Sequence, residues 1–293
     1  MKKYLNLSIS CFTALALLSS CEDGDKPFDE IFANTGRGAV LRTIDQEGSF
    51  FDRNDTSTSW SVVFEAQDPE DGALLEKVDF FVGFDDNTDD EDAPRFNGVQ
   101  DPAEVLVETV PASAFTIGEF GFPRASVDSS FEEALTALGL VPGEYDGGDR
   151  ILFRLELTLT DGRVFSNADN TGTIEGSFFA SPFLYPLTIK CVPTAPVPGD
   201  YTIEINDSFG DGWDGAFITV TQDGTEVEYT ITEGDTGTFT FTVPDGTTQL
   251  DFEYTPGNFE GEHTYNITGP TGELAVEDGP NPTPGEIILS ICI

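Results

Sequence analysis

Short runs in which apolar and polar side chains alternate recur along this chain, and they restrict its fold more than any other feature. The clearest run covers residues 151–160, where the alternation is strict from Phe153 onward. The sequence Thr160-Asp161-Gly162-Arg163 then leads into a second run. A period of two places successive side chains on opposite faces of a β-strand, and an Asp-Gly turn is typical of a hairpin. Gly, Asp and Pro separate the other runs. The sequence therefore predicts an all-β protein.

The runs fall into two groups on either side of a proline-rich segment. Residues 193–199 contain three prolines, which prevent a regular β-ladder there. We therefore expect a β-sandwich domain over residues 38–192, a linker over 193–199 and a second β-sandwich domain over 200–293. The first is expected to be immunoglobulin-like with one short inserted helix, and the second to be jelly-roll-like. The expected strands are 39–44, 60–66, 75–83, 104–111, 151–160, 163–166 and 184–191, then 201–206, 216–222, 226–232, 237–243, 249–254, 263–268, 273–276 and 286–292.

One helix is predicted inside the first domain, over residues 130–138. Ser130 and Glu133 have the spacing of a capping box, in which each side chain binds the other residue's backbone N–H. Leu135 and Leu138 follow at helical spacing, and Gly139 is suited to end the helix.

The charge balance excludes whole classes of partner. The 293 residues include 54 Asp and Glu but only 13 Lys and Arg, which gives a net charge of −41. A nucleic-acid partner needs a basic patch, and none is visible; a polybasic membrane-binding segment is absent for the same reason. High charge can also cause disorder, but 38% of the residues are hydrophobic and 25 are Phe, which is enough for a core.

The N-terminus has the pattern of a signal peptide. Lys2 and Lys3 precede a mostly apolar stretch that is too short to span a membrane. The stretch ends in Leu18-Ser19-Ser20-Cys21, which resembles the lipobox of bacterial lipoproteins. That resemblance implies removal of residues 1–20 and attachment of lipid, such as palmitate, to Cys21, with the acyl chains as a membrane anchor. The alternative is an ordinary secretory signal with an incidental cysteine.

An acidic tether, residues 21–37, follows the expected lipidation site. Glu22 and Asp23 directly after the cysteine resemble the export signal of surface lipoproteins in bacteria with Sus-type glycan uptake systems. This resemblance implies an outer-membrane protein that faces the cell surface. The alternative is a simple solvated tether.

Removal of the signal peptide leaves two cysteines without a role. Cys11 departs with the signal and Cys21 carries lipid, so Cys191 and Cys292 remain in an oxidising compartment. A disulfide between them would close a loop of about 100 residues and contribute about 4–5 kcal/mol. The alternative is two buried thiols.

The second domain has an unusual distribution of charge, which points to a cation. Residues 197–293 contain 19 Asp and Glu and no Lys or Arg, so their carboxylates have no basic partner except His263. The segment from Asp207 to Gly215 holds three Asp and three Gly in nine residues. Closely spaced carboxylates suit calcium, and Gly permits the backbone angles that turn carbonyl groups toward it. The expected calcium ligands are Asp207, Asp211, Asp214, Glu260 and Glu262. The alternative is a turn in which Asp side chains bind their own backbone and Trp213 packs in the core.

The same segment resembles a domain of secreted and surface proteins from gliding and marine bacteria. That domain is recognised by the signature Asp-Ser-Tyr-Gly-Asp-Gly-Trp-Asn-Gly, from which this chain departs with Phe209 and Asp214. The resemblance covers the second domain and implies a β-sandwich that is carbohydrate-binding or adhesive. More loosely, the layout of the first domain is similar to accessory lipoproteins of Sus-type systems.

Catalytic constellations are not evident in the sequence. His263 is the only histidine, so neither a two-histidine zinc site nor a Cys–His pair is available. We therefore expect a non-enzymatic, lipid-anchored protein with structural calcium that binds a glycan for an outer-membrane transporter complex. Trp213 or Trp60 would stack on the sugar. The alternative is a structural or adhesion subunit that binds protein.

Overall fold

The computed structural model describes residues 37–87, 103–176 and 178–292 of the chain. The expected signal peptide, Cys21 and nearly all of the acidic tether lie outside these residues. Contacts divide the chain into a unit of Met1–Gly38 and a unit of Ala39–Ile293, and the second unit holds all the elements described below.

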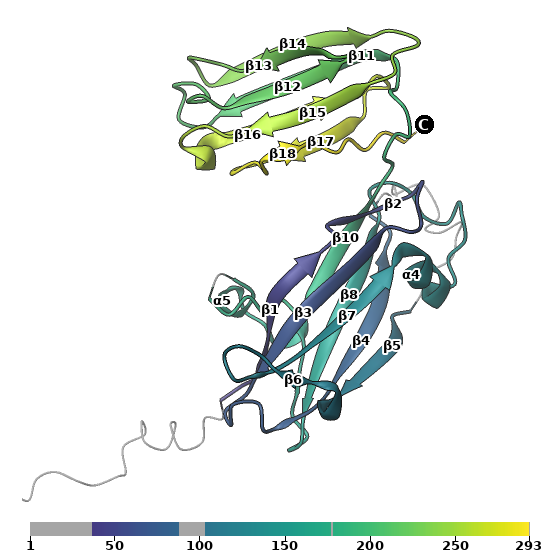
Figure 1. Ribbon diagram of the computed structural model, residues 1–293, viewed down its shortest axis with the longest axis vertical. Helices are drawn as coiled ribbons and strands as arrows, with labels where there is room; N and C mark the ends of the chain where they lie inside the picture. Colours follow the sequence, from purple (N-terminus) through teal and green to yellow (C-terminus); the bar gives the residue numbers. More distant parts are fainter. Residues whose placement is uncertain (1–36, 88–102, 177, 293) are drawn as a thin grey trace, which may run out of the picture. The chain divides into compact units, whose positions relative to one another are not determined.

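The first half of that unit is a sandwich of two sheets (Figure 1). Within each sheet the strands pair antiparallel, except that β2 and β10 are parallel. One sheet has the order β1 (Val40–Glu47), β3 (Ser59–Gln67), β7 (Pro123–Ser130), β6 (Thr116–Ile117). The other has the order β2 (Phe50–Asp52), β10 (Leu184–Lys190), β8 (Arg150–Leu159), β4 (Leu75–Asp85), β5 (Val105–Pro111), with β9 (Val164–Phe165) beside β8.

Helices are short throughout the described residues. Helix α4 (Phe131–Leu138) begins after Ser130 with the predicted capping box and ends at Gly139 in the left-handed conformation, so this prediction is confirmed. The others are α5 (Gly172–Glu175) and the 3-10 turns η1 (Ala112–Ala114), η2 (Asn167–Asp169) and η3 (Glu260–Glu262). Among the described residues, no helix has the length and apolar character needed to cross a membrane.

The second half is a sandwich of two four-stranded antiparallel sheets. The first has the order β14 (Thr236–Val243), β11 (Gly199–Asp207), β16 (His263–Thr268), β17 (Leu274–Asp278). The second has the order β13 (Thr225–Tyr229), β12 (Phe217–Gln222), β15 (Leu250–Thr255), β18 (Gly285–Glu286). The prediction of an all-β protein of β-sandwich class is confirmed.

Each sandwich has its own hydrophobic core, because alternate side chains of its strands point between its two sheets. The burial of β8 alternates along its whole length, as the sequence pattern predicts. One core draws on residues from Ala39 to Ile189 and the other on residues from Tyr201 to Ile291. The expected linker, residues 193–199, lies between these two sets.

The strand predictions differ from the structure at three unexpected strands and at the last expected one. The short strands β2 and β6 were not expected. Strand β7 was not expected, because its sequence lacks alternating apolar residues and only Val127 and Ser129 are buried. The last strand was expected over 286–292 but ends at Glu286. Beyond it, Ile287 and Ser290 donate single backbone hydrogen bonds to Phe252 and Ala275, which is too few for a ladder.

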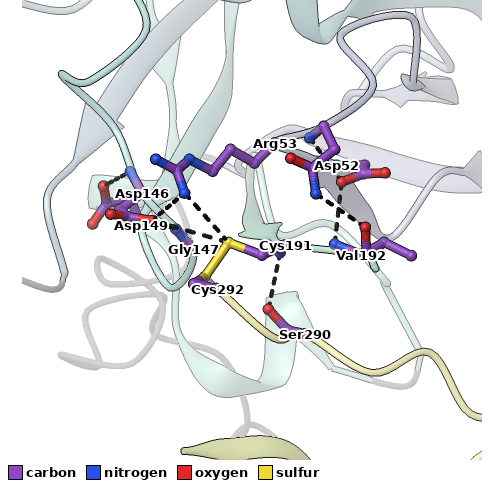
Figure 2. A network of polar contacts seen from close by, with 10 residues as sticks. Asp52, Arg53, Asp146, Gly147, Asp149, Cys191, Val192, Ser290 and Cys292 are labelled. Atoms are coloured by element: carbon purple, nitrogen blue, oxygen red, sulfur yellow. Dashed lines mark hydrogen bonds and ion pairs between the residues drawn. A yellow bond between two sulfur atoms is a disulfide. The ribbon is translucent and has the colours of Figure 1, made fainter. Parts of the chain in front are cut away.

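The predicted disulfide between Cys191 and Cys292 is confirmed (Figure 2). The backbone N–H of Cys191 donates to Ser290 Oγ at 3.0 Å, and the Ile291 N–H donates to the Cys191 carbonyl at 2.8 Å. Gly147 lies in the loop that precedes β8, and a Cβ there would lie 2.3 Å from Cys292 Sγ. Glycine is therefore required where this loop passes the sulfur atoms. The disulfide thus fixes the C-terminal tail to the end of β10.

Candidate functional site

Loops from several strands meet at one end of the second sandwich. The loop that follows β11 donates backbone hydrogen bonds from Ser208 to Glu262 at 2.9 Å and from Trp213 to Ile231 at 2.8 Å. Asn258 donates to the Asp214 carbonyl, and Asn281 donates to the Glu260 carbonyl. We call residues 207–215, 231–236, 256–262 and 279–283 the loop end. These bonds hold four separate chain segments in a fixed arrangement.

Asp207 organises the first of these loops. Its Oδ1 accepts from the Phe209 N–H at 3.1 Å, and its Oδ2 accepts from the N–H groups of Gly210, Asp211 and Gly212 at 2.9–3.0 Å. Burial alone would raise the pKa of Asp207, but the backbone donors outweigh burial and hold the pKa below its usual value. Asp207 is therefore a buried carboxylate in its charged form.

A group of three carboxylates forms around Asp207. Carboxylate oxygens of Asp207, Asp211 and Glu262 lie within 4.8 Å of one another. The side chains of Asp211 and Glu262 accept no hydrogen bond among the described residues, and residues 197–293 supply no Lys or Arg. Like charges at this separation repel unless a cation or a proton intervenes. The oxygen-only donor set is the type that calcium prefers.

Two of the five expected calcium ligands lie outside this group. Glu260 accepts hydrogen bonds from the Tyr254 hydroxyl and the Gly257 N–H, both at 2.6 Å. Each of its carboxylate oxygens is therefore already bound to a neighbouring residue. Burial, and then the Glu260 bond, raise the pKa of Tyr254. Asp214 has an Oδ2 atom that is buried without a hydrogen-bond partner, but it is not among the clustered carboxylates.

The alternative reading of this loop, in which Asp binds its own backbone, describes Asp207 well. Other aspartates in the protein do the same: Asp68 accepts from the N–H groups of Glu70, Gly72 and Leu74. The backbone bonds of Asp207 therefore do not by themselves indicate a metal. What distinguishes the loop end is that Asp211 and Glu262 bring two further carboxylates to Asp207.

The prediction that Trp213 stacks on a ligand is wrong, because its side chain is fully buried. Its Nε1 donates to the Asn206 carbonyl at 3.0 Å, and its ring lies 5.6 Å from the His263 ring in a stacked arrangement. Bond and packing together make Trp213 a core residue that supports the loop end from beneath.

Trp60 is also wrong as a stacking candidate. It has no exposed surface, and its ring stacks on Phe153 with centroids 4.4 Å apart in the first core. Trp60 is buried because it occupies an inward-facing position of β3, along which burial alternates.

Two exposed aromatic residues at the loop end were not among the residues predicted from the sequence. Phe209 is 73% exposed and Phe259 is 69% exposed. Phe259 has φ +58°, a left-handed conformation that bulky residues rarely adopt. A usable signal was present, since both residues lie in polar, Gly-rich segments without the alternation that directs side chains into a core.

Comparisons with known proteins identify no family for the chain. No protein-family model matches it, and none of the curated proteins does. The alpha-2-macroglobulin of E. coli in its native conformation matches 83% of this chain at 8% identity and a TM-score of 0.28, but the match covers only 16% of that protein. A Mobiluncus mulieris adhesin with intramolecular disulfide, isopeptide and ester bond cross-links matches at 12% identity and a TM-score of 0.23, covering 79% of each chain. Likenesses of this size carry no argument about function.

Proposed function

We propose that the protein is a non-enzymatic outer-membrane lipoprotein, anchored through Cys21 and facing the cell surface, whose loop end binds a glycan for a Sus-type uptake complex. The observation that supports this is that the loops carrying the carboxylate group also carry two exposed rings, Phe209 and Phe259. Aromatic faces pack against sugar rings, and carboxylates accept hydrogen bonds from sugar hydroxyls. Because hydrogen bonds hold the loops, little conformational entropy is lost on binding.

Substitution of the two rings tests this function. We expect Phe209→Ala with Phe259→Ala to abolish retardation of the protein in native gels that contain a polysaccharide that retards the wild type. Phe178→Ala is the matched control, because Phe178 is 79% exposed but belongs to the first half of the chain. Equal retardation of both variants and the wild type would show that the loop end is not the glycan site.

Structural calcium at Asp207, Asp211 and Glu262 belongs to the same proposal. A cation there would relieve the repulsion among three carboxylates and add its binding free energy to the stability of the second sandwich. We expect a chelator to lower the melting temperature by several degrees. Asp211→Asn with Glu262→Gln should remove that response, whereas Glu228→Gln, an exposed acid on β13, should keep it. An unchanged melting temperature in the wild type would exclude the site.

The lipid anchor has a separate test. Palmitate labelling of cells should disappear in Cys21→Ala, and protease added to intact cells should digest the wild-type protein if it faces outward. Continued labelling of the variant would contradict the lipobox interpretation.

A second function, as an assembly subunit that binds protein, is favoured by apolar side chains on the first sandwich. Ile117 is 72% exposed and Phe120 is 63% exposed, and both belong to the hairpin that joins β6 to β7. Ile117→Ser with Phe120→Ser should then abolish capture of outer-membrane partners after crosslinking, while polysaccharide retardation stays unchanged.

A further inference from the structure

The outer face of the sheet β14-β11-β16-β17 carries mostly hydroxyl and amide side chains. Along each strand, every second side chain points into the core, and the side chains between them point outward. Residues that pair across neighbouring strands point to the same side, so the outward side chains form one face. We call these nine residues the threonine face: Thr236, Thr238 and Thr240 on β14; Thr202, Glu204 and Asn206 on β11; Thr264, Asn266 and Thr268 on β16.

The residues form three rows across the sheet. Asn206 lies between Thr236 and Thr264, so this row adjoins the loop end. Glu204 lies between Thr238 and Asn266 in the second row.

In the third row, Thr202 lies between Thr240 and Thr268. Adjacent strands are about 4.8 Å apart, so the rows present closely spaced donors and acceptors on a rigid surface.

These polar groups are available to a ligand. None of the nine side chains forms a hydrogen bond with another part of the described chain. The Thr side chains are β-branched, so few rotamers are lost on binding. A hollow of about 360 Å³ lies at the first two rows, and all six of their residues line it, together with Ile205, Gly237 and Tyr265.

The opposite face of the same sandwich is different in charge. There Thr219 lies between Glu228 and Glu253, and Thr221 lies between Glu226 and Asp251. Acids thus flank both of these threonines on β12. Exposed threonine alone could reflect only its preference for strands, but that preference acts on both faces and does not explain why acids are concentrated on one of them.

Charge complementarity identifies the class of ligand. Glu204 is the one acid among the nine residues of the threonine face, within a domain that has 19 acids and no Lys or Arg. Two further acids border it on the same side of the sheet: Asp200 on β11, and Glu277 on β17, which pairs with Asn266. A cationic ligand would be drawn to the acidic face or the loop end, and an anionic ligand would be repelled by Glu204 and by the adjoining carboxylates of the loop end. An uncharged ligand rich in hydroxyl groups can use the paired donor and acceptor capacity of Thr and Asn.

We propose that the threonine face is a second contact surface, continuous with the loop end, for an uncharged polysaccharide chain that runs from the loop end across β11. This inference rests on the proposed glycan-binding function and adds where the chain lies and which charge it has. Because Asn206 directly precedes Asp207, a sugar that packs against the loop end is next to the first row of hydroxyls.

The test uses isosteric substitutions that remove hydroxyl groups and keep the strands. Purified protein is run in native gels that contain soluble neutral glucan, mannan, xylan or galactan, or a polyuronate. We expect retardation by at least one neutral polymer and none by the polyuronate. Thr238→Val with Thr264→Val should weaken binding about tenfold, which corresponds to about 1.4 kcal/mol, since each substitution removes one hydrogen-bonding hydroxyl group. Thr219→Val with Thr221→Val, on the acidic face, should stay within about twofold of wild type.

Other outcomes overturn the inference in ways that can be told apart. If a neutral polymer retards the wild type and both double variants equally, the threonine face is wrong but glycan binding stands. If only the polyuronate binds, the charge argument is wrong. If no polymer retards the wild type, the proposed function fails together with this inference. Unchanged Trp213 fluorescence of the Val variants, measured in a Trp60→Phe background, confirms that the second sandwich is folded.

Discussion

Removal of the Cys191–Cys292 disulfide should destabilise the second sandwich and leave the first almost unchanged. The two residues are 101 positions apart, and the loop between them contains every strand from β11 to β18. Cys191 directly follows β10, whose side chains belong to the first core. When only the second sandwich unfolds, the disulfide keeps its chain as a closed loop, which restricts the unfolded ensemble.

The size of the effect follows from the length of that loop. Closing a loop of about 100 residues costs the unfolded chain about 4.7 kcal/mol of entropy at 25 °C, and measured losses from small domains are about 2–5 kcal/mol. With a urea dependence of about 1–3 kcal/mol per molar, the midpoint should fall by about 2 M. The double substitution Cys191→Ala with Cys292→Ala avoids a free thiol.

The distribution of tryptophan allows each sandwich to be followed separately. Trp60 lies in the first core and Trp213 in the second, and both are fully buried. In a Trp60→Phe background the fluorescence reports the second sandwich, and in a Trp213→Phe background it reports the first. The Cys double substitution should shift the Trp213 transition by about 2 M and the Trp60 transition by less than about 0.3 M.

Two results would refute the reasoning. Equal shifts of both transitions would mean that the two sandwiches unfold as one cooperative unit. No shift of either transition would mean that restriction of the unfolded chain contributes nothing to stability. The oxidised protein treated with a reductant serves as a control, because it should match the Cys double substitution.

Three further predictions concern single residues. Folding lowers the pKa of Asp207 from its ordinary value of 3.8, so its ionised form stabilises the second sandwich above that pH, and the contribution is lost as pH falls through the lower folded pKa. Asp207→Asn should therefore reduce the urea midpoint at pH 7, and the difference from wild type should narrow below about pH 3.8; a pH-independent difference would contradict this. Gly147→Ala should hinder disulfide formation, because its Cβ would lie 2.3 Å from Cys292 Sγ, and thiol labelling under denaturing conditions should detect free cysteine. Ser130→Ala should cost the first sandwich about 1 kcal/mol through loss of the α4 cap, measured by Trp60 fluorescence, and Ser130→Asp should restore most of it.

Periodicity in the sequence is enough to predict strands whose residues follow it. Strand β8 has one face in the core, and its hydrophobic alternation shows this directly. Strand β7 pairs over seven positions with β3, yet it contributes little to the core, so its place comes from backbone pairing that leaves no hydrophobic pattern. Sequence patterns therefore identify the strands that fill a core better than those that complete a sheet.

The loop end shows why site residues were only partly predictable. Glu260 and Glu262 are two positions apart in a polar segment, and the sequence offers no reason to separate them. The η3 turn directs Glu260 to Tyr254 and brings Glu262 to Asp207 and Asp211. Trp213 was misplaced for a similar reason. Its Gly- and Asp-rich neighbours suggest exposure, but its indole N–H reaches the Asn206 carbonyl only in the folded loop.

The net charge of −41 says little about what each surface of the second sandwich can bind. Salt screens exposed charges beyond about 8–10 Å, so acids elsewhere on the molecule hardly affect a ligand on the threonine face. The carboxylates of Asp207, Asp211 and Glu262 lie within 4.8 Å of one another, where screening is weak. The same composition therefore supports a cation at the loop end and an uncharged ligand beside it. Local arrangement, and not total charge, determines which ligand each surface favours.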